Sequence, residues 1–403
     1  MAKKNSFLLF FFIFLSTFSL IKLFENLKNL DAWEYGEWLI NYQAGFVRRG
    51  LPGEIIFQFS SLLENNIQLS FFIILSTICL LYYYLNYLFL KNIKLSFFNL
   101  FIIFSPLFYL FFVMINGVGI RKEILLYLFY LAYLINLSSK NFNINKIWKF
   151  LYIFPLILFA HEAMFFYLPY VLLPLLFVIK KDDYKNLIFH SLTLIIICLF
   201  VMVIMYINKG TNEHVVSICK SLDLFAPVKC ENFGPIYALK DELMRDQNYE
   251  SIKFFYLDAK FSTWVGFLFY LFYSFFPILI FFYSIKLKEK IIKNRYIFLL
   301  ILLTFWVFGL PLLHIAMDWS RFFSIHLHLV AFFVFFLQRI NIIDYKKSGF
   351  FIKLNNFFTL NKKICFLFLL IYSTFFYHEE YFSKDVKLEL MYKKIYQNIN
   401  KKI

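Results

Sequence analysis

The chain has 403 residues, of which 61% are hydrophobic, 23% aromatic and only 16% charged, and its formal net charge is +16. Soluble domains carry about 45–50% apolar and about 25% charged residues, so one soluble core cannot bury this much apolar surface. The composition therefore excludes a cytosolic enzyme, a secreted disulfide-rich protein and a disordered chain, and it predicts a protein whose main solvent is lipid.

Apolar stretches separated by charged clusters predict an all-α fold, a polytopic transmembrane helix bundle of about eleven spans, because about 20 apolar residues are needed to cross a bilayer. The first stretch follows Met-Ala-Lys-Lys-Asn and lacks a small-residue cleavage site, so we expect an uncleaved signal anchor. We expect one integral membrane domain over residues 1–403. The predicted spans are residues 6–24, 68–90, 95–116, 123–138, 149–160, 163–179, 187–207, 262–284, 296–316, 322–338 and 363–378, of which the short pair 149–160 and 163–179 is a candidate broken hairpin.

The distribution of Lys and Arg predicts which side of the membrane each loop faces. With the N-terminus inside, the six inner segments hold 19 Lys and Arg in 61 residues, whereas the two larger outer loops, 25–67 and 208–261, hold 10 in 97. Positive residues concentrate on the cytoplasmic side of membrane proteins. The charge therefore predicts a multi-pass membrane protein whose two larger loops face the outer side, with no nucleic-acid partner.

The first outer loop contains paired arginines, Arg48 and Arg49, on the side where cations are sparse. Four of the chain's 11 glycines lie within residues 36–53, which predicts tight backbone turns around this pair. The planar fork of arginine suits bidentate binding of phosphate or carboxylate. The pair is therefore a candidate substrate-binding site, and a translocation-stop signal or an interfacial anchor is the alternative.

Two further cations, Arg121 and Lys122, lie in a short outer loop between predicted spans. Their position opposes the charge bias, so they are candidate substrate-binding residues. The alternative is that they extend to lipid headgroups or pair with the adjacent Glu123.

His161 and Glu162 interrupt the apolar run of residues 151–179. An ionisable pair at membrane depth indicates a functional site by default, and both side chains suit proton transfer near neutral pH. They are candidate catalytic residues, and a helix-turn pair that faces water is the alternative.

The outer loop 208–261 contains Cys219 and Cys230, eleven residues apart. An oxidising compartment allows a disulfide there, and two free thiols are the alternative. The other three cysteines fall in or at predicted spans, where they are expected to be small buried hydrophobic residues.

The last outer hairpin contains Asp318 and Arg321, which are three residues apart and could pair on one helical face. Asp318 is a candidate catalytic residue and Arg321 a candidate substrate-binding residue, and an internal pair that only fixes the turn is the alternative. His326 and His328 follow in the next span, but a two-residue spacing places them on different helix faces. No spacing of His, Cys and carboxylates in the chain predicts a metal site.

These four sites all face the outer side, so we expect them to share one cavity. Such a cavity suits a substrate that is anionic near the headgroup plane and polar beyond it. A polyprenyl-diphosphate-linked sugar has this layout.

The combined motifs resemble those of polytopic inner-membrane proteins from bacterial surface-polysaccharide clusters, and the nearest group is the O-antigen polymerases. The residues that carry the resemblance are Asn41-Tyr-Gln-x-Gly45-Phe-x-Arg48-Arg49-Gly50-Leu, Arg121-Lys122-Glu123, His161-Glu162 and Asp318-Trp-x-Arg321.

The resemblance implies a glycosyltransferase that moves a growing glycan from undecaprenyl diphosphate onto another lipid-linked repeat unit, with no cofactor and no nucleotide sugar. It also implies that the membrane is the bacterial inner membrane and that the two larger loops face the periplasm. It implies an undecaprenyl-diphosphate-linked oligosaccharide and membrane lipid as partners, together with a chain-length regulator protein. The cations that would neutralise the leaving diphosphate are Arg48, Arg49 and Arg321. The candidates for the base that takes the acceptor's proton are Glu162, His161 and Asp318.

Two other functions stay open at this point. A GT-C-like glycosyltransferase that uses a polyprenyl-phosphate sugar donor would explain the acidic residues of the first outer loop, Asp31, Glu34 and Glu37. A flippase for lipid-linked sugars is the second alternative, but transporters often show internal repeats and mid-membrane charges, and the sequence has neither.

Overall fold

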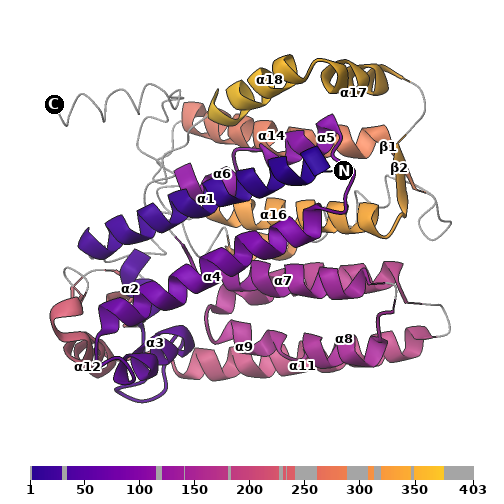
Figure 1. The fold of residues 1–403 in the computed structure, drawn as a ribbon. Coiled ribbons are helices and arrows are strands. Elements are labelled where there is room, and N and C mark those ends of the chain that lie inside the picture. Colours follow the sequence, from indigo (N-terminus) through magenta and orange to yellow (C-terminus); the bar gives the residue numbers. More distant parts are fainter. Residues whose placement is uncertain are drawn as a thin grey trace, which may run out of the picture. The chain divides into compact units, whose positions relative to one another are not determined.

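The chain forms two compact units in the computed structural model, and Figure 1 shows their helices and strands. The site unit comprises Leu9–Phe89 and Gly119–Ser251, and the terminal unit comprises Met1–Leu8, Leu90–Val118 and Ile252–Ile403. The residues that the structure describes are 2–29, 34–114, 120–139, 141–179, 183–226, 230–232, 234–240, 261–287, 307–312, 319–345 and 349–375.

The site unit is built from helices. Its first helix, α1, begins in the terminal unit and continues into the site unit. The helical elements are α1 (Ala2–Asn29), α2 (Glu34–Leu39), α3 (Leu51–Ser61), α4 (Ile67–Leu90), α7 (Glu123–Leu137), α8 (Ile144–Leu151), α9 (Phe154–Leu158), η1 (Glu162–Tyr167), α10 (Leu168–Leu172), η2 (Leu173–Phe177), α11 (Tyr184–Ile207), α12 (Asn212–Leu222), η4 (Asp223–Phe225) and η5 (Tyr237–Leu239).

The terminal unit combines helices with one small sheet. Strands β1 (Ile285–Leu287) and β2 (Ile343–Tyr345) pair antiparallel, with Ile285 opposite Tyr345. The helices are α5 (Phe97–Ile103), α6 (Tyr109–Met114), α14 (Phe261–Ser284), α16 (Trp319–Arg339), α17 (Phe350–Leu360) and α18 (Lys362–Phe375). The expected all-α architecture therefore holds for most of the described residues, and this two-stranded sheet is an addition to it.

Prolines explain why the predicted spans 149–160 and 163–179 are broken into short segments. Pro155, Pro169 and Pro174 each stand in the first turn of a separate segment, α9, α10 and η2. Proline has no backbone N–H and fits best in the first turn of a helix, and each of these three prolines stands where a new segment begins. The candidate broken hairpin is thus a chain of short α and 3₁₀ segments.

Four helices among the described residues are long and apolar enough to cross a membrane: Ser6–Glu25, Ile67–Leu90, Tyr184–Ile207 and Arg321–Arg339. A fifth candidate is the pair Ile352–Leu360 and Lys362–Ser373, which is bent by 109° and forms either a broken span or a re-entrant loop. The chain therefore has several helices of membrane-spanning character, but the eleven predicted spans are not confirmed.

Two other predicted spans do not form a single helix of full membrane-crossing length. Predicted span 95–116 is divided between α5 and α6, and α7 has only 15 residues, which is short for a bilayer crossing. Most of predicted span 296–316 lies outside the described residues.

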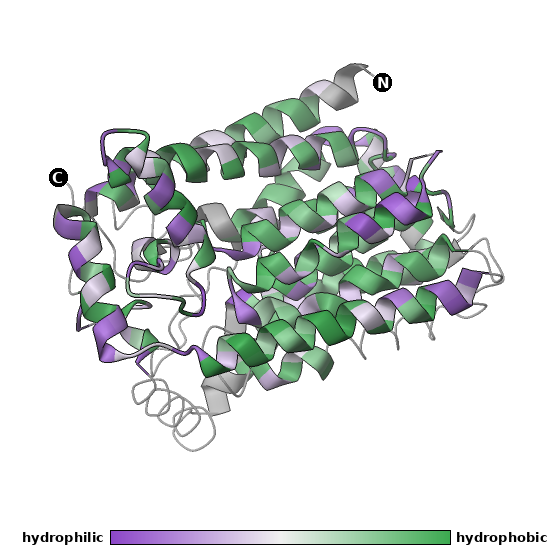
Figure 2. Ribbon diagram, turned by 90° about the horizontal axis from the view of Figure 1, so that it is seen from below, coloured by the Kyte–Doolittle hydropathy of each residue, from purple (hydrophilic) through white to green (hydrophobic). Residues whose placement is uncertain are grey.

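Helix packing within the site unit places its polar residues at the helix ends. Helices α7, α8, α9 and α11 run side by side (Figure 1), and α1 contacts α4 through a buried 2.8 Å hydrogen bond between Ser19 and Tyr83. In Figure 2 the helices are hydrophobic along most of their length, and hydrophilic residues gather toward helix ends and loops. The loops before α3, α7 and η1 carry the charged residues described next.

Candidate functional site

The first outer loop folds so that Arg48 and Arg49 stand immediately before α3. Arg49 has a left-handed backbone conformation, with a φ of 64°, which is uncommon for a residue other than glycine. Gly53, in the first turn of α3, packs so closely on the carbonyl oxygen of Ile40 that a Cβ atom would overlap it. A glycine is therefore required at this position, and it lets α3 pack directly against the end of α2.

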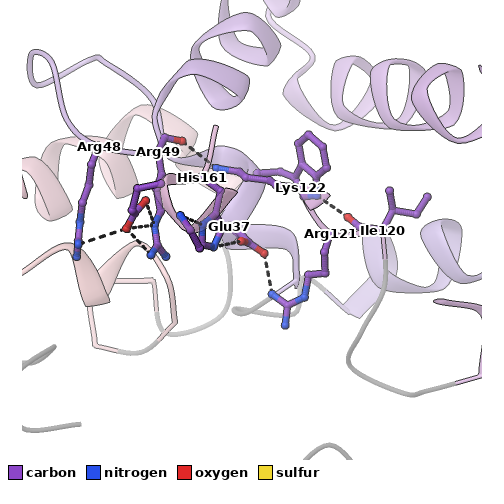
Figure 3. Close-up of polar contacts among 10 residues, drawn as sticks. Glu37, Arg48, Arg49, Ile120, Arg121, Lys122 and His161 are labelled. Atoms are coloured by element: carbon purple, nitrogen blue, oxygen red, sulfur yellow. Dashed lines mark hydrogen bonds and ion pairs between the residues drawn. The ribbon is translucent and has the colours of Figure 1, made fainter. Parts of the chain in front are cut away.

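Arg49 and Glu162 form a bidentate ion pair. Figure 3 shows Arg49 beside Arg48, with Lys122 and His161 close by. The Nε of Arg49 donates to both carboxylate oxygens of Glu162, at 3.0 and 2.8 Å, and its Nη2 donates to Oε1 at 2.6 Å. Arg48 approaches the same carboxylate, with Nη1 3.6 Å from Oε1, and also donates to the carbonyl oxygen of Ala238 at 3.2 Å. Two arginines thus contact one carboxylate, that of Glu162 at the start of η1.

A second ion pair joins the end of α2 to the start of α7. Arg121 donates to Glu37 across 2.8 Å, and both side chains are buried. His161 Nε2 lies 3.6 Å from the other oxygen of Glu37. Because His161 Nδ1 accepts a hydrogen bond from the backbone N–H of Ala163, a neutral His161 ring carries its proton on Nε2, toward Glu37.

Lys122 links the two ion pairs. Its side chain is fully buried, and its Nζ donates to the carbonyl oxygen of Arg49 at 2.8 Å. Burial lowers the pKa of Lys122 to about 7, although the carboxylate of Glu37 acts in the opposite direction. Lys122 is therefore close to its titration point at neutral pH.

The neighbours of Glu162 keep its carboxylate charged. Burial alone would raise the pKa of Glu162, but Arg49, helped by His161 and Arg48, holds that pKa well below its usual range. Glu162 is therefore ionised throughout the physiological pH range. We use the name charged cluster for Glu37, Arg48, Arg49, Arg121, Lys122, Glu123, His161 and Glu162.

Most of the predicted site residues meet in this cluster. Six of them do so from three separate loops: Arg48, Arg49, Arg121, Lys122, His161 and Glu162. Arg321 is buried in α16 of the terminal unit, and Asp318 lies outside the described residues.

Glu37 and Glu123 are the two members of the cluster that were not predicted as site residues. Glu37 is 2% exposed and contacts both Arg121 and His161. The neighbouring Trp38 donates a hydrogen bond to the carbonyl oxygen of Ile120 and so holds α2 against the start of α7. The sequence signal for Glu37 is the acidic run Asp31, Glu34 and Glu37, which by itself favours only the alternative transferase.

Cys219 and Cys230 are joined by a disulfide, with their Cα atoms 6.0 Å apart. Cys219 belongs to α12, and Ser221 of the same helix accepts a hydrogen bond from the side chain of Asn41 in the first outer loop. The two outer loops are therefore connected to each other.

An almost entirely apolar cavity of about 330 Å³ lies beside the charged cluster. Its walls include Trp38, Leu51, Leu125 and Ala160, which stand within three residues of the cluster members Glu37, Arg49, Lys122 and His161. The site unit thus places a hydrocarbon-lined space next to a group of cations.

The composition of the cluster favours an anionic ligand over a metal ion. Among the residues that the structure describes, no group of three or more His, Cys, Asp and Glu side chains is placed to hold a metal. The carboxylates of Glu37 and Glu162 are instead paired with arginines, which repel a metal cation.

No protein-family model, curated protein or solved structure matches this chain significantly. The chemistry of the charged cluster is therefore the basis for the functional proposal.

Proposed function

We propose that the chain is a polymerase of O-antigen or a related surface polysaccharide, a glycosyltransferase at the periplasmic face of the bacterial inner membrane. It transfers a glycan from undecaprenyl diphosphate onto another lipid-linked repeat unit. The observation that carries this proposal is that Arg48 and Arg49 converge on one carboxylate beside an apolar cavity, in a unit with helices long and apolar enough to cross a membrane.

The substrate's three parts match three features of the site unit. The apolar cavity suits a hydrocarbon chain. The cations of the charged cluster suit the diphosphate, because guanidinium groups bind phosphate oxygens in a bidentate manner. The glycan would then extend outward from the cluster.

In the proposed reaction, the bond between the anomeric carbon and the diphosphate oxygen breaks, and a bond forms to the acceptor hydroxyl oxygen. The diphosphate leaves with the electron pair, and Arg48 and Arg49 stabilise its developing charge. The hydroxyl proton passes to a base of the cluster. Glu162 and His161 are the candidates that the structure describes, and Asp318 stays a candidate from the sequence.

Glu162 is a weak base while Arg49 holds it, since the ion pair favours its charged form strongly. An incoming diphosphate competes for the same guanidinium. When Arg49 turns to the phosphate, Glu162 loses its partner and its pKa rises toward the ordinary value, so it becomes a better proton acceptor. Substrate binding would thus activate the base.

Deletion of the gene tests the proposal. The mutant should retain single repeat units on the cell surface and lose the ladder of longer chains on a gel. Wild-type protein should restore the ladder, Arg49→Ala should not, and Tyr84→Ala, a change of an exposed tyrosine on α4, should restore it fully. Loss of every repeat unit, including the first, would contradict a polymerase.

A GT-C-like glycosyltransferase with a polyprenyl-phosphate sugar donor is the second candidate function. It is favoured by Glu37, a buried carboxylate of the first outer loop that faces His161. Loss of the first repeat unit in the deletion mutant would support this alternative.

A further inference from the structure

A second cavity of the site unit, of about 530 Å³, lies where Phe46 of the first outer loop meets the end of α11 and the start of α12. Its lining is mixed. Phe46 and Tyr206 contribute aromatic rings that are 39% and 70% exposed, and polar side chains come from the segment 208–214. It differs in this respect from the apolar cavity beside the cluster.

The polar lining side chains are mostly groups that can both donate and accept hydrogen bonds. They are Asn208, Thr211 and His214, and Lys209 is the one donor-only group among the lining side chains. The ammonium of Lys209 lies over the ring of Tyr206, 4.4 Å from its centroid. Thr211 and His214 contact each other at 2.8 Å in the capping box that begins α12.

This cavity adjoins the charged cluster through the backbone. The N–H of Arg48 donates to the carbonyl oxygen of Asn208 at 2.9 Å. Gly210, with a φ of 114°, packs on Val47 and Leu239, and a Cβ atom there would lie 3.1 Å from Val47 and 2.9 Å from Leu239. The residues on either side of Val47 thus contribute to different sites, since Phe46 lines the cavity and Arg48 contacts Glu162.

We propose that this cavity binds one sugar ring of the glycan, next to the diphosphate that Arg48 and Arg49 would bind. The assignment of the sugar to a lipid-linked substrate rests on the proposed function. A sugar ring has faces of C–H groups, which pack on aromatic rings, and a rim of hydroxyls, each of which donates and accepts hydrogen bonds. The cavity offers both kinds of surface, and its volume lies in the range of small-molecule sites.

A phosphate-bearing lipid headgroup is the competing occupant, and the lining favours it less. Phosphate only accepts hydrogen bonds, so its sites gather cations and backbone N–H groups. Here one lysine is present, and its ammonium is held over an aromatic ring. Asn208, Thr211 and His214 can each donate and accept hydrogen bonds, so they match sugar hydroxyls better than phosphate oxygens.

Saturation-transfer NMR on the full-length protein in lipid nanodiscs tests the proposal. The probes are methyl glycosides of glucose, galactose and N-acetylglucosamine, each at millimolar concentration. At least one glycoside should receive saturation in the wild type. Phe46→Ala and Tyr206→Ala should abolish most of this signal, and Tyr206→Phe should preserve it because the ring remains. Tyr84→Ala is the matched control, since Tyr84 is another exposed tyrosine, 57% against 70% for Tyr206, on a different helix of the same unit.

The outcomes separate this proposal from the polymerase proposal. Absence of signal from all three glycosides, or an unchanged signal in both alanine variants, would overturn the sugar site. Displacement of a bound glycoside by inorganic phosphate or by anionic phospholipid in the nanodisc would identify the cavity as a headgroup site. Glycoside binding that depends on Phe46 and Tyr206 supports the sugar site even if gene deletion leaves the polysaccharide ladder intact, which would refute only the polymerase.

Discussion

The buried ammonium of Lys122 donates a hydrogen bond to the main-chain oxygen of Arg49, 2.8 Å away. This contact ties the start of α7 to a residue with a left-handed backbone, whose guanidinium in turn holds Glu162. Lys122 is therefore a positioning residue for the arginine pair, and its protonation state is coupled to the folded structure.

The folded state should become more stable as the pH rises from about 7 to about 10.5, because burial lowers the pKa of Lys122 to about 7 from a model-compound value of 10.5. Between these values the unfolded chain binds a proton that the folded chain does not. Protonation of Lys122 therefore lowers the free energy of unfolding, and this loss of stability disappears as the pH increases. The full shift corresponds to at most about 5 kcal/mol. The melting temperature of the detergent-solubilised protein, followed across this pH window, measures the effect.

Lys122→Met removes the titrating group but keeps a long apolar side chain, so the rise in melting temperature between neutral and alkaline pH should disappear. Lys220→Met is the matched control, because Lys220 is an exposed lysine on α12. A rise that persists unchanged in Lys122→Met would show that another group causes it.

The ion pair between Arg49 and Glu162 should show strong coupling in a double-mutant cycle. Arg49→Met or Glu162→Gln alone removes one partner of a mostly buried pair, in which the side chains are 20% and 18% exposed. Breaking a buried pair costs about 3–5 kcal/mol, and we expect the lower end here because of the partial exposure. The double variant should lose clearly less than the sum of the single losses. Unfolding by sodium dodecyl sulfate in mixed micelles gives these free energies, and additive losses would contradict a direct interaction.

A prenyl diphosphate should stabilise the protein through the charged cluster. Farnesyl diphosphate is expected to raise the melting temperature, and farnesol, which lacks the phosphates, is not. Arg48→Lys and Arg49→Lys keep the charge but lose the planar fork, so they should lose much of this shift, and the alanine variants nearly all of it. Lys220→Ala should respond like the wild type. Equal shifts in all the arginine variants would remove Arg48 and Arg49 from the binding site.

The identity of the cluster could be predicted from the sequence to a considerable degree. Arg48, Arg49 and Arg121 fall in segments predicted to face the outer side, where cations are sparse, and His161 and Glu162 interrupt an apolar run. The structure adds that the cations are already paired with carboxylates. Glu37 could not be assigned in advance, because its contact with Arg121 depends on how α2 packs against the start of α7.

The membrane character could be predicted from composition, and the four long apolar helices match the predicted spans 6–24, 68–90, 187–207 and 322–338. The breaks within other apolar stretches could not be located. The short lengths of 149–160 and 163–179 predict a candidate broken hairpin, but a count of apolar residues does not show that Pro155, Pro169 and Pro174 each begin a separate segment. The bend of 109° between α17 and α18 is likewise invisible to a hydropathy pattern.

Reduction of the disulfide between Cys219 and Cys230 should lower stability. The bridge closes a short loop, with the two cysteines 11 residues apart, and such cross-links contribute about 2–4 kcal/mol. We expect a lower melting temperature in the presence of a reductant. The variant with Cys219→Ser and Cys230→Ser should melt at the reduced temperature and be insensitive to the reductant. Two alkylatable thiols in unreduced protein would exclude the bridge.

The predicted sidedness can be tested by labelling engineered cysteines with a membrane-impermeant maleimide in cells whose outer membrane is permeabilised. The native free cysteines Cys79, Cys198 and Cys365 are all buried and should react slowly. Leu62→Cys and Val216→Cys place exposed thiols in the loops 25–67 and 208–261.

Both engineered thiols should be labelled in intact spheroplasts, because the excess of Lys and Arg lies on the opposite side of the membrane. Asn141→Cys, an exposed position in a predicted inner segment, should react only after the inner membrane is opened. The charged cluster draws Arg48 and Arg49 from the loop that contains Leu62, so protection of Leu62→Cys would place the cluster on the cytoplasmic side. A lipid-linked glycan on the periplasmic face would then have no access to the arginines, and the polymerase proposal would fail with the topology.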